Sequence, residues 1–161
     1  MALGDNTLRS AAGNSQRGRN PFMVQTTLNW ATALSDKGGA LAAADVVPVI
    51  AVLKGTMILN AGIEVDTATD GSTFTVDLGT GVDPDVFVDG FDATSAAAVV
   101  AQNPAAYQPV MAVADDNIDV TIASLSGGAV SSGKFRVWAV LMDCTDMGDT
   151  AADEVDRDTL A

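Results

Sequence analysis

Four aspartates in one short segment are the side chains of this chain with the most potential for chemistry. They lie in the run Asp83-Pro-Asp-Val-Phe-Val-Asp-Gly-Phe-Asp92. Carboxylate oxygens are ligands that Ca²⁺ prefers, so Asp83, Asp85, Asp89 and Asp92 could bind a divalent cation. The spacing of the run does not place a glycine or a closing glutamate where an EF-hand loop needs them, and Asp beside Gly or Pro is also typical of turns. We predict turn-forming aspartates and no metal, with a cation site as the alternative.

Other reactive groups are scarce. The chain has no histidine, which excludes Ser-His and Cys-His nucleophile pairs and the commonest metal ligand. Lys37, Lys54 and Lys134 each lie beside a glycine, in segments where we expect solvated turns. Gly79-Thr-Gly81 lacks the lysine and the following helix of a phosphate-binding loop. The sequence therefore predicts neither an enzyme nor a bound cofactor.

Charge and cysteine content limit the partners and the compartment. The net charge is -13, which argues against nucleic acid because phosphate groups are met by Lys and Arg. The single cysteine, Cys144, allows no intrachain disulfide and suits a reducing cytosol. No apolar run approaches about 18 residues, and the N-terminus lacks a signal-peptide pattern. We expect synthesis in the cytoplasm, with no membrane partner.

The two ends of the chain carry opposite charge. Residues 1–21 are polar, and three arginines there accompany a single acid, whereas the charged residues after Leu141 are all acidic except Arg157. We predict an extended N-terminal arm (1–21), a β-sandwich domain (22–145) and an acidic C-terminal tail (146–161). Polar arms of this kind can order on a neighbouring subunit. The predicted contact residues of the arm are Arg9, Arg17, Arg19 and Phe22.

Short apolar and β-branched runs predict an all-β domain. Strands are expected at 24–32, 41–53, 56–66, 73–78, 86–89, 107–113, 118–125 and 134–143, with a loop at 35–40 and a helical turn within 93–102. Pro48 makes its strand an edge strand because it cannot donate to a ladder. Strands recurring about every 8 to 14 residues are typical of a sandwich or barrel. We predict a jelly-roll-like antiparallel β-sandwich of about eight strands.

Local signals add detail to these strands. Asp70-Gly71 between two alternating runs predicts a tight β-hairpin. In the second run, Phe74, Val76 and Leu78 should share the buried face. Gly62 predicts a bulge that changes the phase of the strand before Ile63.

Large aromatic residues are more common in a core than at an interface. Trp30 and Trp138, the two tryptophans of the chain, are accordingly predicted to be core residues.

Three segments resemble a known family. Thr73-Phe-Thr-Val-Asp-Leu-Gly, the Asp83 to Asp92 run and Gly133-Lys-Phe-Arg-Val-Trp-Ala-Val-Leu-Met-Asp143 are similar to the capsid decoration (cement) proteins of tailed bacteriophages, over residues 44–143. The resemblance implies a jelly-roll-like virion protein without enzymatic activity. It also implies binding to the outer capsid surface, where the protein clamps adjacent major capsid protein subunits. A homo-oligomer is implied as well, with a trimer favoured and a dimer as the alternative.

Two other functions remain open at this point. The same sandwich could form part of a phage tail, connector or fibre, or it could be a carbohydrate- or receptor-binding module displayed on the virion.

Overall fold

The computed structural model describes residues 9–10, 20–96, 99–101, 109–126 and 130–144. Ten strands and one helix lie in these residues, and they occur in the following order: β1 (Arg9–Ser10), β2 (Phe22–Asn29), α1 (Trp30–Lys37), β3 (Val46–Val52), β4 (Thr56–Thr67), β5 (Thr73–Thr80), β6 (Val88–Asp92), β7 (Val99–Ala101), β8 (Val110–Met111), β9 (Asp116–Ser126) and β10 (Lys134–Asp143).

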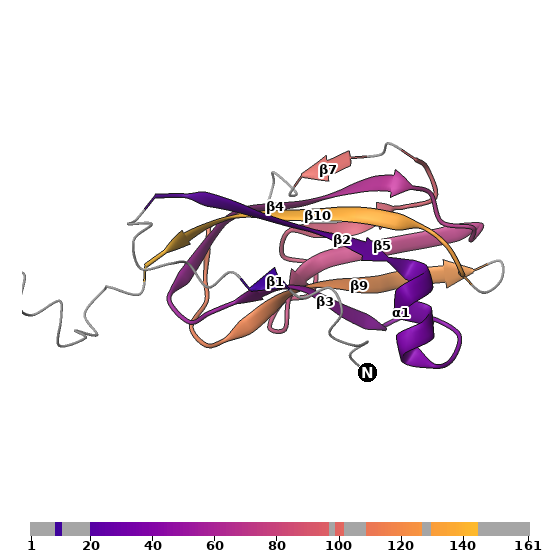
Figure 1. The fold of residues 1–161 in the computed structure, drawn as a ribbon, viewed down its shortest axis with the longest axis horizontal. Coiled ribbons are helices and arrows are strands. Elements are labelled where there is room, and N and C mark those ends of the chain that lie inside the picture. The colour runs from indigo at the N-terminus through magenta and orange to yellow at the C-terminus, as the bar shows by residue number, and fades with distance from the viewer. Residues whose placement is uncertain (1–8, 11–19, 97–98, 102–108, 127–129, 145–161) are drawn as a thin grey trace, which may run out of the picture.

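The strands form two sheets that face each other (Figure 1). One sheet has the order β1-β3-β9-β5-β6, and the other has the order β2-β10-β4-β7, with β8 also paired to β4. Every pair is antiparallel except β1 with β3. From β2 to β5 each successive strand changes sheet, and β7 and β8 share one edge position. This is the strand order of a jelly roll, so the predicted fold class is confirmed.

The hairpin predicted at Asp70-Gly71 is wrong. The strands on either side of it, β4 and β5, belong to different sheets, so this segment crosses from one sheet to the other. A two-residue type I′ turn needs a positive φ at both central residues, and Gly71 is not among the glycines with positive φ. Instead, the Asp70 carboxylate accepts hydrogen bonds from the backbone N–H groups of Ser131 and Ser132, at 2.8 and 3.1 Å. In the described part of the chain, the consecutive strands that pair are β5 and β6.

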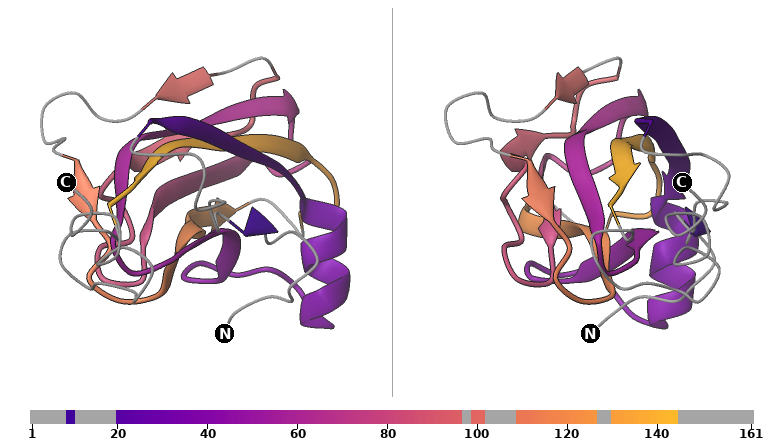
Figure 2. Two further views of the ribbon diagram at one scale, coloured as in Figure 1. Left: turned by 60° about the vertical axis from the view of Figure 1, so that its left-hand side comes forward. Right: turned by 90° about the vertical axis from the view of Figure 1, so that its left-hand side faces the viewer.

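Helix α1 replaces the end of the strand predicted at 24–32 and part of the loop predicted at 35–40. The Asn29 side chain accepts a hydrogen bond from Ala31 N–H at 3.0 Å and caps the helix. Gly38 ends the helix in the left-handed conformation, with φ of 67°. Figure 2 shows that the helix lies at one end of the sandwich.

The predicted change of phase in β4 is present, but it does not occur at Gly62. Gly62 pairs regularly with Trp138, and the register shifts instead between Ile58 and Asn60 and again near Thr67. The bulge before Asn60 brings Ala61 and Ile63 to the same buried face as Ile58.

Strand β3 is close to the predicted edge position. Its partners are β9 on one side and only the two residues of β1 on the other. A register shift follows Pro48, which accommodates the missing donor. Two of the remaining elements also differ from expectation, because residues 99–101 of the predicted helical turn form β7, and the strand predicted at 107–113 is limited to Val110–Met111 within the described residues.

The core lies between the inner faces of the two sheets. Phe74, Val76 and Leu78 are fully buried, as their alternation predicted. Trp30 is also fully buried, whereas Trp138 is only half-buried. The prediction of a core position for Trp138 is wrong because Trp138 lies on the opposite face of β10 from the buried Val137 and Ala139.

The loop between β5 and β6 folds back over Gly79. A Cβ at Gly79 would lie 2.2 Å from the carbonyl oxygen of Asp83 and 2.2 Å from the carbonyl carbon of Pro84. No side chain fits there, so the glycine permits the close approach of two backbones. The loop is fixed further by two hydrogen bonds, from Thr80 N–H to the Asp83 carbonyl at 2.8 Å and from Phe87 N–H to the Leu78 carbonyl at 3.0 Å.

Asp119 lies beside this loop on the outer face of its sheet. It pairs with Gly79 on β5 and with Pro48 on β3, and it is only 9% exposed. Its Oδ1 atom has no hydrogen-bond partner among the residues that the structure describes. Burial, together with the negative charge of Asp116, raises the pKa of Asp119 to about 6.

We predict that Gly79→Ala destabilises the fold by about 1 to 3 kcal/mol, because the methyl group forces the loop off the sheet. Gly39→Ala is the matched control, since a Cβ there meets nothing within 4 Å. Urea unfolding of both variants measures the effect. Equal midpoints for the two variants would show that the loop does not pack on Gly79.

We predict that Asp119→Asn flattens the pH dependence of stability. The folded-state pKa of about 6 lies above the unfolded value of about 3.9. The folded protein therefore holds the extra proton, and stability falls as the pH rises from about 4 to about 7. The loss should be about 1 to 3 kcal/mol in the natural protein and absent in the variant. Urea unfolding at pH 4.5 and 7.5 tests this, with the exposed Asp66→Asn as control, and parallel pH profiles for Asp119→Asn and the natural protein would contradict it.

Candidate assembly surface

The predicted acidic segment is a scaffold of turns. Asp92 accepts hydrogen bonds from the backbone N–H and the hydroxyl of Thr94, at 2.9 and 2.7 Å, and the side-chain bond lowers the pKa of Asp92. Gly90 N–H donates at 2.7 Å to Asp77, outside the segment. Among the residues that the structure describes, no three acidic or cysteine side chains gather as metal ligands would. Asp77 and Asp92 therefore brace loops in this region.

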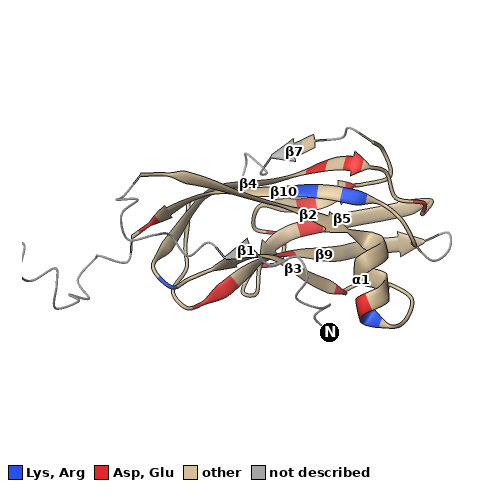
Figure 3. Cartoon of the chain, in the orientation of Figure 1, with Lys and Arg blue, Asp and Glu red and all other residues tan. Residues whose placement is uncertain are grey.

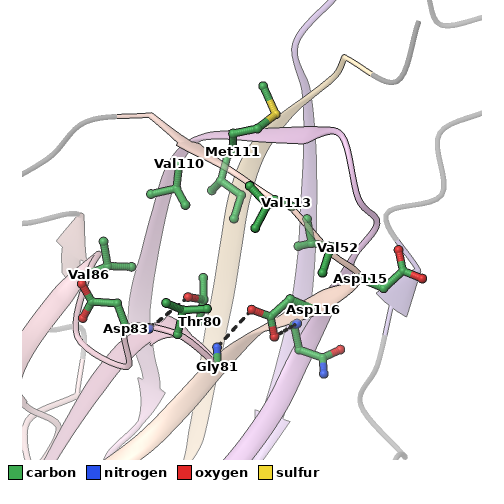
Figure 4. Close-up of a pocket in the computed structure, with 15 residues that line it drawn as sticks. Val52, Thr80, Gly81, Asp83, Val86, Val110, Met111, Val113, Asp115 and Asp116 are labelled. Carbon is green, nitrogen blue, oxygen red and sulfur yellow. Dashed lines mark hydrogen bonds between the residues drawn. The ribbon is translucent and has the colours of Figure 1, made fainter. Parts of the chain in front are cut away.

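A pocket of about 530 Å³ opens between the two sheets at the end opposite α1. Its walls come from both sheets, with Val52 and Thr80 on one and Ile58 and Val110 on the other. Most of the lining is apolar, as Figure 4 shows. A concave apolar site of this size is typical of a binding site.

Exposed apolar side chains gather around the pocket. Val82 is 86% exposed and Val113 is 78% exposed, and both line it together with Met111. Leu53, in the turn between β3 and β4, is 43% exposed and directly follows the lining residue Val52. Grouped exposure of this kind marks an interaction surface, whereas isolated exposed apolar residues need no explanation. We call this surface, made of the pocket with residues 53, 82, 111 and 113, the open end.

Carboxylates hold the loops of the open end in place. Asp115 accepts from Lys54 N–H at 2.9 Å and ties the turn after β3 to the loop before β9. The two oxygens of Asp116 accept from Gly81 N–H at 3.2 Å and from Asn117 N–H at 2.8 Å (Figure 4). These hydrogen bonds hold the loops around the pocket, which we call its rim, in place within the chain itself.

The open end is negatively charged. Asp83, Asp115 and Asp116 line the pocket, and the lining residues that the structure describes include no lysine or arginine. Lys54 is the neighbouring basic residue, since its N–H group donates to Asp115. The ion pairs found among the described residues are Lys37 with Asp45 and Arg136 with Glu64, and neither involves the pocket. A hydrogen bond with Asp85, partial desolvation and the negative charge of Asp85 raise the pKa of Asp83, because the two carboxyl groups lie close together.

The opposite end of the sandwich is closed. Trp30 and α1 cover it, and Lys37 at the end of the helix forms an ion pair with the buried Asp45. Burial of Asp45 raises its pKa, but its hydrogen bonds with Lys37 and the N–H of Ala42 outweigh this effect, and the pKa is lowered. Nearby, the hydrogen bonds from Ser131 and Ser132 hold the pKa of Asp70 at about 2.

The residues predicted as arm contacts are only partly described. Phe22 is half-buried at the start of β2, where it packs against the core. Arg9 lies in β1, whose backbone pairs with Ile50 and Ala51 of β3. Arg17 and Arg19 lie outside the described residues. The role of these four residues in an interface stays a prediction.

Sequence reasoning missed the open end. Val82 stands between Gly81 and Asp83, and Val113 stands in the run Ala-Val-Ala-Asp-Asp. A large apolar residue inside a turn segment is the signal that could have identified both, since turns are otherwise composed of small and polar residues.

Comparisons with known proteins show a shared fold. Neither a family model nor a curated protein matches the sequence. Solved structures similar to this chain include one from the cyanophage Pam1 capsid asymmetric unit, with a TM-score of 0.57, 17% identity, and coverage of 84% of this chain and 93% of that chain. A chain from the capsid of Ralstonia phage GP4 has a TM-score of 0.56 at 16% identity and covers 81% and 89%.

A third match comes from the acidic stable capsid structure of Helicobacter pylori bacteriophage KHP30. It has a TM-score of 0.51 at 11% identity and covers 76% of this chain and 86% of that chain. The fold of this chain is thus similar to the folds of chains in three phage capsid structures.

Proposed function

We propose that this chain is a structural virion protein that binds the outside of a tailed-bacteriophage capsid and clamps adjacent major capsid protein subunits. The observation that carries the proposal is the fold likeness to chains from three phage capsids, each over more than three quarters of this chain. The acidic composition and the absence of histidine fit a structural role, with no enzymatic activity and no cofactor.

Decoration of this kind works by mass action. A protein that binds the assembled shell better than its separated parts stabilises the shell by that difference in affinity. In our proposal the protein assembles as a homotrimer, with a dimer as the alternative, so that several weak contacts act together. The N-terminal arm adds contacts through Arg9, Arg17, Arg19 and Phe22.

The copy number in purified virions separates this role from a tail, connector or fibre role. We expect hundreds of copies per particle, measured by quantitative mass spectrometry against the major capsid protein. About 3 to 12 copies, as in closed rings and fibres, would contradict a capsid position.

Deletion of residues 1–19 tests the arm. We expect the circular dichroism spectrum to stay rich in β structure, because only the two residues of β1 are lost from the sheets. Attachment to undecorated shells, measured by co-sedimentation, should weaken about tenfold or more when the arm contacts are removed. Arg9→Gln with Arg17→Gln and Arg19→Gln is the matched variant that keeps the chain length. Attachment equal to that of the full chain in both cases would remove the arm from the proposal, whereas failure of the full chain to attach would remove the decoration function itself.

A further inference from the structure

The open end is a surface without a function so far. We propose that its pocket takes an apolar side chain carried on an extended, basic segment of the capsid surface, and that this is the contact by which the sandwich attaches. This inference rests on the proposed function and names the surface that performs it.

Apolar side chains from both sheets line the pocket of the open end. Val52, Ile58, Val86 and Val110 line a space of about 530 Å³, and the pocket lies where the two sheets diverge. Val82 and Val113 stand exposed at its mouth, where they would pack on the stem of an inserted side chain. Val52 and Ile58 are already buried, so a leucine- or phenylalanine-sized group would remove from water mainly the exposed apolar surface of Val82, Met111 and Val113.

The negative charge of the open end favours a basic partner. Three carboxylates line the pocket without a lysine or arginine among the lining residues. Asp115 and Asp116 use oxygens to accept backbone N–H bonds, so their charge stays fixed at the rim. A lysine or arginine beside the inserted side chain would meet these carboxylates, and complementary charge speeds and orients association.

The same charges disfavour a second copy of the sandwich as the occupant. Two open ends that approach each other would bring six rim carboxylates together, since each end contributes Asp83, Asp115 and Asp116.

The basic side chains of the described sandwich are also few (Figure 3). Between residues 20 and 144 the basic residues are Lys37, Lys54, Lys134 and Arg136. Lys37 and Arg136 form ion pairs within the chain, with Asp45 and Glu64, which leaves Lys54, beside the open end, and Lys134 for a neighbouring copy. A basic segment of a different protein fits the open end better.

The rim is also organised in advance. The hydrogen bonds of Asp115 and Asp116 connect three loops that are far apart in sequence, and Gly79 fixes the loop that contains Val82. Loops that need no ordering on binding lose less entropy, which favours affinity.

The experiment compares attachment to undecorated shells for three sets of variants. Val82→Ser with Val113→Ser removes the apolar mouth, and both residues are exposed enough that folding is unaffected. Val99→Ser is the matched control, since Val99 is 63% exposed on β7, away from the pocket. We expect attachment of the double variant to weaken about tenfold or more and the control to equal the natural protein.

The third set tests charge. Asp83→Asn with Asp115→Asn keeps the amide oxygen that can accept the Lys54 N–H bond but removes two charges from the rim. Attachment at low salt should fall, and it should depend less on salt than attachment of the natural protein. Asp66→Asn, an exposed change elsewhere, is the control.

Two outcomes would overturn the inference. Shells that bind the serine and asparagine double variants as well as the natural protein would show that another surface attaches. A change of oligomeric state in the serine double variant, measured by light scattering, would show that a second copy occupies the open end.

A peptide measurement separates this inference from the proposed function. Methyl resonances of Val82, Val110 and Val113 are followed by NMR while acetyl-Lys-Leu-Lys-amide or acetyl-Glu-Leu-Glu-amide is added. We expect shifts with the lysine peptide and none with the glutamate peptide. Absence of shifts with both contradicts the pocket inference, whereas failure of the natural protein to attach to any shell contradicts the decoration function alone.

Discussion

Burial of two apolar sheet faces against each other is the constraint on which this structure depends, and Trp30 secures it at one end. The Trp30 ring meets Phe74 edge-on at 4.9 Å and Phe135 at 5.4 Å between ring centroids. Phe74 belongs to β5 in one sheet and Phe135 to β10 in the other, so one side chain joins both sheets. Edge-to-face aromatic pairs add about 0.5 to 1.5 kcal/mol each beyond their burial. The helix that carries Trp30 thereby closes this end of the core.

In the loops of this sandwich, aspartate side chains accept backbone hydrogen bonds that tight hairpin turns would satisfy within their own backbone. Because successive strands cross between sheets, most connections cannot close on themselves as hairpins, and their backbone N–H groups need other acceptors. Asp70, Asp92 and Asp115 supply these acceptors, in each case across or within a loop. The negative charge of these aspartates is solvated, and it makes the surfaces of separate copies of the protein repel each other. The strongly acidic composition thus follows from loop architecture as well as from solubility.

The sequence predicted local periodicity well and sheet membership poorly. The strand predicted at 134–143 is correct at both ends, and its burial alternates regularly from Lys134 to Leu141. Asp70-Gly71 misled because the same residues suit a hairpin within a sheet and a crossing between sheets, and only contacts with Ser131 and Ser132 decide between them. Helix α1 was missed although Asn29 and Gly38 mark its two ends, since its eight residues are too few for a clear helical period. The pocket could not be predicted because its walls come from segments about 60 residues apart, such as Val52 and Val113.

The two ends of the sandwich differ in what joins the sheets. At the closed end Trp30 contacts both sheets, whereas at the open end Val52 of one sheet and Ile58 of the other line the same pocket. A side chain inserted into this pocket would contact both sheets, and it would join them at the open end as Trp30 joins them at the closed end. Binding would then stabilise the sandwich as well as the shell, because a ligand that binds only the folded state shifts its unfolding equilibrium. If the open end binds such a side chain, we expect the bound form of the protein to resist unfolding better than the free form.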